Sequence, residues 1–146
     1  MRRSLWPLAL LTLCLAPASR AGESVTIELR IGNIRSTDGQ VLVVLFAQED
    51  GFPGEPDKAF AKDIVPARPG ATRATFVVPP GRYAALAVHD INGNGDCDMR
   101  WPIPIPKEPV GASRDAKGFM GPPKFRDAAF DATAGTVVQA FDVADL

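Results

Sequence analysis

A stretch in the middle of the chain places an oxygen-bearing side chain at every second position and a glycine at the sixth. Such alternation on a tightly curved backbone can aim several oxygens at one hard cation, which takes about six to eight oxygen ligands. In a calcium loop over residues 90–98, Asp90, Asn92 and Asn94 would bind directly. Asp96 would offer its main-chain carbonyl, and Asp98 would bind directly or through a water. The spacing therefore makes Ca²⁺ the candidate cofactor.

The loop differs from an EF-hand in two respects. Position twelve, where an EF-hand has a bidentate acid, is Trp101, and residues 83–88 before the loop have a strand pattern instead of a helical one. The missing carboxylate would have to come from elsewhere, and Glu108 is the next acid downstream. Without a full ligand set we expect weak affinity, with a Kd of about 10⁻⁴–10⁻³ M.

The same residues have a second interpretation as plain turn formers. Asn92-Gly93 and Asn94-Gly95 supply positive φ angles, and Asp90 can accept hydrogen bonds from the local backbone. The sequence therefore leaves two interpretations open, an ion-organised loop and a turn held by its own hydrogen bonds.

Two residues beside the loop are candidates for ligand binding. His89 is the only histidine, which excludes any mechanism that needs two imidazoles within the chain. Its alternatives are a structural role in a loop and a place on a binding surface. Trp101 stands among prolines, and we expect it to pack on the body of the domain, with an exposed aromatic strip as the alternative. A nucleophile pair of His89 with Cys97 has no supporting motif.

Composition limits the class of protein. The chain has 146 residues, of which 46% are hydrophobic and 23% charged, a profile typical of one soluble globular domain. Sixteen lysines and arginines stand against seventeen aspartates and glutamates. Because this balance leaves no excess positive charge to neutralise phosphates, nucleic acid is excluded as an electrostatically bound partner.

The N-terminus resembles an export signal. Arg2-Arg3 precedes an apolar run over residues 5–15, which is shorter than the roughly 20 residues that a bilayer span needs. Small residues follow, and the tripeptide that ends at Ala21 fits the small-x-small cleavage rule. We therefore expect residues 1–21 to be a signal peptide and residues 22–146 a single periplasmic or secreted domain. After cleavage no stable membrane span remains.

Seven segments of the mature chain have strand patterns, and none has a convincing long helical one. They are residues 25–31, 41–47, 61–67, 73–78, 83–89, 128–132 and 136–143. This count predicts an all-β protein, a Greek-key β-sandwich. Turn residues at 37–39 and 134–135 predict hairpins between the first two and the last two strands. Residues 89–125 form one long Pro/Gly-rich loop whose apolar residues predict an ordered excursion packed over the sandwich.

Three segments resemble the DUF2141 family of small exported bacterial proteins. They are His89-Asp90-x-Asn92-Gly93-Asn94-Gly95-x-x-Asp98 after Pro80-Gly81-x-Tyr83-Ala84, Ile105-Pro106-Lys107-Glu108-x-x-Gly111-x-Ser113, and Pro123-x-Phe125-x-Asp127-Ala128-x-Phe130. The chain departs from the family pattern at Pro104 and Pro109-Val110. The resemblance implies a prealbumin-like or immunoglobulin-like sandwich outside the cytoplasm, and it leaves the activity open.

We therefore expect an exported, non-enzymatic binding or structural module with a calcium-organised loop. Its partner would be another protein, a glycan or a component of the cell envelope. The alternative is a small periplasmic hydrolase of transthyretin-related type, which rests on the similarity of folds alone.

Overall fold

A computed structural model describes residues 22–146, so the expected signal peptide and its cleavage site lie outside the described residues. The strands are β1 (Val25–Gly32), β2 (Gln40–Phe46), β3 (Ala61–Pro66), β4 (Thr72–Val78), β5 (Gly81–Asp90), β6 (Met99–Arg100), β7 (Ile105–Pro106), β8 (Val110–Ala112), β9 (Phe130–Ala132) and β10 (Thr136–Asp142). The short helical elements are η1 (Pro56–Lys58), η2 (Ser113–Asp115) and α1 (Phe125–Ala128). The prediction of an all-β protein is confirmed.

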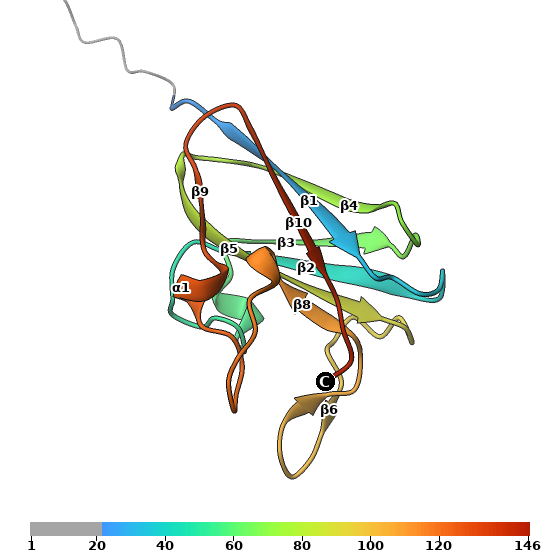
Figure 1. Cartoon of the computed structure of the whole chain (residues 1–146). Helices are drawn as coiled ribbons and strands as arrows, with labels where there is room; N and C mark the ends of the chain where they lie inside the picture. Colours follow the sequence, from blue (N-terminus) through green and yellow to red (C-terminus); the bar gives the residue numbers. More distant parts are fainter. Residues whose placement is uncertain (1–21) are drawn as a thin grey trace, which may run out of the picture.

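The strands form two main layers (Figure 1). One sheet has the order β10-β1-β4, with β1 parallel to β10 and antiparallel to β4. The other has the order β3-β2-β5-β8, and β9 pairs with the beginning of β5. A separate two-stranded ribbon, β6-β7, lies outside both layers. The sandwich is thus as predicted, while its Greek-key order stays a prediction.

The core lies between the two sheets and follows from period-two alternation. β1 buries Val25, Ile27, Leu29 and Ile31, none more than 2% exposed, and points the residues between them outward. β2 faces it with Val41, Val43 and Leu45, all fully buried. Each such side chain contributes about 1.5–3 kcal/mol by leaving water. Within residues 22–146, the members of this core run from Val25 to Val143 and come from both sheets.

Both predicted hairpins are wrong. β1 and β2 lie in different sheets, and so do β9 and β10. The alternation of apolar and polar residues correctly indicated which face of each strand is buried. It could not indicate pairing, because two strands in facing sheets alternate in the same way as two strands paired in one sheet. Asn33, which has a positive φ of 59°, turns the chain out of β1 and donates a side-chain hydrogen bond to the Val143 carbonyl. The chain then crosses to the opposite layer.

The long loop after β5 is only partly packed on the sandwich. Its β8 segment joins the sheet as an edge strand beside β5. The Val110 and Ala144 backbones also exchange two hydrogen bonds of 3.0 and 2.9 Å, which link β8 to the end of the chain. The β6-β7 ribbon and the turn between η2 and α1 instead extend beyond the sheets (Figure 1). The predicted packing therefore holds for β8 and fails for these two segments.

The buried hydroxyl of Ser113 holds the later part of this loop against the sandwich through two hydrogen bonds. Ser113 is fully buried, donates a 2.6 Å hydrogen bond to the Ala128 carbonyl and accepts one of 2.9 Å from the Ala85 amide. It thereby ties η2 to β5 and to α1. A buried donor or acceptor left without a partner costs about 1–3 kcal/mol.

Replacing Ser113 by alanine should therefore lower the free energy of unfolding by about 1–3 kcal/mol, because two buried backbone groups lose their partner. Urea denaturation would measure the change. Ser24→Ala is the matched control, since Ser24 is exposed, and it should shift stability by less than about 0.5 kcal/mol. Equal effects of the two substitutions would contradict this role of Ser113.

Candidate functional site

The candidate site begins at the end of β5, where β2 positions two buried polar residues. In the antiparallel pairing, Gln40 lies opposite Asp90 and Val41 opposite His89. His89 is 1% exposed and Asp90 fully buried. The His89 Nε2 atom lies 3.0 Å from the Asp38 carbonyl oxygen, and because a carbonyl only accepts, Nε2 carries the proton. The histidine expected as a ligand contact thus lies inside the protein, where it holds the turn before β2.

Asp90 anchors the loop through its carboxylate. The carboxylate accepts hydrogen bonds from the Gly95 amide at 2.8 Å, the Asn94 amide at 3.2 Å and the Gln40 side chain at 2.8 Å. Burial alone would raise the pKa of Asp90, but these hydrogen bonds outweigh it and the pKa lies below the ordinary value of 3.8. The group is therefore held as a buried, fully hydrogen-bonded anion.

The two asparagines organise the outer part of the loop. The Asn92 side-chain oxygen accepts the Asn94 amide at 3.0 Å, and the Asn94 side-chain oxygen accepts the Asp96 amide at 2.9 Å. Their side-chain nitrogens both donate to the Asp98 carboxylate, Asn92 at 2.8 Å and Asn94 at 3.2 and 3.3 Å. The alternation seen in the sequence is thus, in this structure, a series of side-chain-to-backbone turns that converge on Asp98.

Glu108 closes the loop from the far side of the β6-β7 ribbon. Its side chain is buried, and its two oxygens accept the Ile91 amide at 3.0 Å and the Asp98 amide at 3.3 Å. The neighbouring Lys107 amide donates to the Asp98 carbonyl at 2.8 Å. Glu108, the nearest acid downstream in the sequence, therefore does lie at the loop, where it accepts hydrogen bonds from both ends of the loop.

Five of the eight predicted site residues come together, and His89, Asp96 and Trp101 do not. Asp90, Asn92, Asn94, Asp98 and Glu108 form one hydrogen-bonded unit, which we call the Asx loop. The Asp96 side chain is exposed and makes no hydrogen bond to the rest of residues 22–146, so only its backbone takes part.

Trp101 also lies outside the Asx loop. It is 76% exposed at the tip of the β6-β7 ribbon, so the expected packing against the sandwich is wrong. A ribbon of two residues per strand that projects beyond the sheets leaves Trp101 no apolar face to cover. Its alternative interpretation, an exposed aromatic strip, is the one that the structure has.

The Asx loop surrounds the single thiol of the described chain. Cys97 is half-buried, and burial raises the pKa of its thiol to about 11, with further contributions from the negative charges of Glu108, Asp98 and Asp90. The thiolate is the nucleophilic form, so a raised pKa makes this thiol a weak nucleophile near neutral pH. Neither a His89–Cys97 nucleophile pair nor a strongly reactive cysteine fits this environment.

Metal binding needs more than carboxylates at this place. Within residues 22–146, no three His, Cys, Asp or Glu side chains are arranged to hold a metal ion. An ion at the Asx loop would also need asparagine and main-chain oxygens, which are ordinary calcium ligands.

Sequence reasoning missed Gln40, which supplies the side-chain donor to Asp90. It lies 50 residues away, and no local pattern connects the two positions. The turn before β2 also lies directly against the end of β5, because a side chain on Gly39 would collide with the Asp90 carbonyl.

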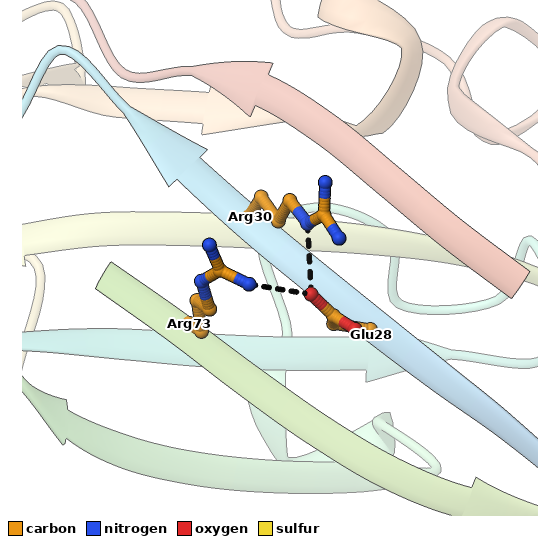
Figure 2. A network of polar contacts seen from close by, with 3 residues as sticks. All are labelled: Glu28, Arg30 and Arg73. Carbon is orange, nitrogen blue, oxygen red and sulfur yellow. Dashed lines mark hydrogen bonds and ion pairs between the residues drawn. The ribbon is translucent and has the colours of Figure 1, made fainter. Parts of the chain in front are cut away.

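A hollow lies at one end of the three-stranded sheet. It has a volume of about 360 Å³ and is lined by the ends of β1, β4 and β10. Figure 2 shows Arg30 and Arg73 donating to one Glu28 oxygen at 2.8 and 3.0 Å. The hydrogen bond from Arg30 holds the pKa of Glu28 below its usual value. The two arginines that line the hollow are therefore already paired with a carboxylate, as in an ordinary ion-pair network at a protein surface.

The described domain is thus a small β-sandwich with an Asx loop closed by a buried glutamate. Residues 29–139 match the model of the DUF2141 family, "Uncharacterized protein conserved in bacteria", so the chain belongs to this family. No curated protein and no solved structure matches the chain. Among the helices of residues 22–146, none is long and apolar enough to cross a membrane.

Replacing Asp90 by asparagine should lower the free energy of unfolding at pH 7 by about 1–3 kcal/mol, because an amide cannot accept all three donors. The lowered pKa means that the stabilisation is fully present above the unfolded pKa and is lost as the pH falls through the folded value. The difference between parent and variant in urea denaturation should therefore shrink below about pH 4.

Asp96→Asn is the matched control, because it makes the same change at an exposed carboxylate of the same loop. A constant difference between parent and Asp90→Asn from pH 7 to pH 3 would contradict the hydrogen-bonded anion.

Cys97 should react slowly with iodoacetamide at pH 8. A thiol with a pKa of about 11 has about a hundredfold less thiolate there than one with the ordinary pKa of 9.0. Mass spectrometry would follow alkylation of the folded chain from Gly22 onward, with the urea-unfolded chain as control. Glu108→Gln should speed the reaction, because it removes the largest of the three electrostatic contributions. Equal rates for folded and unfolded protein would contradict the raised pKa.

Proposed function

We propose that the protein is an exported, non-enzymatic binding module whose Asx loop is organised by calcium. The observation that carries the proposal is that three carboxylates, Asp90, Asp98 and Glu108, accept hydrogen bonds from one short loop. Because these three groups are not arranged to hold an ion by themselves, asparagine and main-chain oxygens would complete the ligand set. Among the ion pairs of residues 22–146, none involves any of these three. Like charges gathered without a cation repel one another, and a divalent ion would remove that repulsion.

The side chains of the loop support such a role through a small rearrangement. Asn92 and Asn94 turn their side-chain nitrogens toward Asp98. Rotation of either amide by half a turn exchanges nitrogen for oxygen and would aim an oxygen at the same place. The exchange costs the hydrogen bonds that those oxygens accept from the Asn94 and Asp96 amides. Because binding must offset that loss, we expect a Kd of about 10⁻⁴–10⁻³ M.

Calcium would act on the binding surface through Glu108. This side chain and the Lys107 amide hold the base of the β6-β7 ribbon against Asp98. An ion that orders the loop therefore also orders the ribbon. The partner we expect is a protein, a glycan or a component of the cell envelope. The hydrolase alternative stays a prediction, because no observation on residues 22–146 favours it.

Isothermal titration of calcium into the chelator-stripped chain from Gly22 onward tests the proposal. The parent should bind with a Kd of about 10⁻⁴–10⁻³ M. Calcium at about ten times the Kd should add about 1.4 kcal/mol to the stability and raise the Tm by a few degrees. Asp98→Asn should weaken binding at least about tenfold, because a hard cation prefers the lost carboxylate.

Asp96→Asn is the matched control and should bind like the parent, since it keeps the main-chain carbonyl through which Asp96 would act. Absence of heat and of a Tm shift in the folded parent would contradict the calcium proposal. Equal loss in both variants would show a general charge effect instead of a site.

A further inference from the structure

Two exposed apolar tips extend from the same end of the molecule. The tip of the β6-β7 ribbon carries Trp101 and Ile103, which are 76% and 69% exposed. The turn between η2 and α1 carries Phe119 and Met120, each 93% exposed. Single exposed apolar residues are ordinary, but large aromatic and sulfur side chains paired at the ends of two projections mark an interaction surface. Figure 1 shows both segments reaching past the sheets in the same direction.

Each tip is a closed turn that presents its side chains outward. Gly118 packs so closely on the Gly121 backbone that any side chain at Gly118 would collide with the Gly121 carbonyl. Met120 at the apex has a positive φ of 55°. In the ribbon, the Ile105 amide donates to the Ile103 carbonyl at 2.8 Å. A backbone that is already closed into a turn loses less entropy when its segment binds.

The segment that contains both tips also differs in charge from the rest of residues 22–146. Residues 99–126, which contain both tips, have six lysines and arginines and two acids, a net charge of +4. The rest of residues 22–146 has seven against fifteen, a net charge of −8. The ion pairs of the described part include none of four exposed basic residues in this segment. They are Arg100, Lys107, Lys117 and Lys124.

We infer that the two apolar tips insert into an anionic lipid surface, with the four basic residues at the level of the headgroups. This inference names the partner of the binding module proposed above, and it does not require calcium. Tryptophan, phenylalanine and methionine gain by entering the boundary between headgroups and acyl chains, and each nearby lysine or arginine adds about fivefold to the affinity for anionic lipid. The acidic remainder of the domain is repelled by the same surface, which favours contact through the tips alone.

The chain supplies its own reporter for this contact. Trp6 lies in the expected signal peptide, so Trp101 is the single tryptophan of the chain from Gly22 onward. The test records its fluorescence while the protein is titrated with vesicles of phosphatidylcholine plus phosphatidylglycerol, in the presence of a calcium chelator. We expect a blue shift and quenching by brominated acyl chains. Salt should weaken the binding, and vesicles of phosphatidylcholine alone should bind at least about tenfold more weakly.

Substitutions separate the tips from the rest of the surface. Phe119→Ser with Met120→Ser should reduce partition into anionic vesicles at least about tenfold, because two large apolar side chains no longer enter the lipid. Lys117→Gln with Lys124→Gln should also weaken it and should reduce its salt dependence. The matched control is Ile64→Ser with Val77→Ser, at two apolar residues that are 56% and 69% exposed on β3 and β4, and it should bind like the parent.

Absence of a fluorescence shift, an equal shift with phosphatidylcholine alone, or loss of binding in the Ile64/Val77 control would each overturn the inference. So would a Trp101 blue shift that needs no lipid and tracks self-association in light scattering, because the tips would then bind a second copy of the chain. Since chelator is present throughout, failure of the calcium proposal leaves the result of this test unchanged.

Discussion

The fully buried carboxylate of Asp90 sets the conditions for the whole of one end of the molecule. A charge removed from water is tolerated only when hydrogen-bond donors replace the water. The donors come from the loop that follows, at Asn94 and Gly95, and from Gln40 on the neighbouring strand. The loop must therefore curl back over the end of β5, and that curl gathers the remaining polar side chains at Asp98.

A second buried carboxylate then decides where the chain goes next. Glu108 accepts amides from both ends of the Asx loop, so the chain has to return to the loop before it enters β8. The residues between Asp98 and Glu108 have no place on either sheet and fold into a short projecting ribbon. The exposure of Trp101 at the end of this ribbon is thus a consequence of polar groups buried at its base.

The segment that carries both apolar tips differs in charge from the rest of the domain. Most acids lie on the sandwich or in the Asx loop, whereas the segment with both apolar tips is basic. Lys107 and Glu108 join the Asx loop to the base of the β6-β7 ribbon. We propose different ligands for the two places, a calcium ion for the loop and an anionic lipid surface for the tips. The two proposals can therefore be tested independently although the sites are neighbours.

The sequence by itself determined the all-β class, the buried face of each main strand and the residues of the Asx loop, because period-two alternation and Asn-Gly spacing act over a few neighbouring positions. Family membership follows from the same local motifs. Only the tertiary structure decided which strands pair, that Gln40 serves Asp90 and that Trp101 faces outward. These depend on contacts between residues far apart in the chain, and a local pattern is the same whether a strand pairs with its neighbour in sequence or crosses to the opposite sheet.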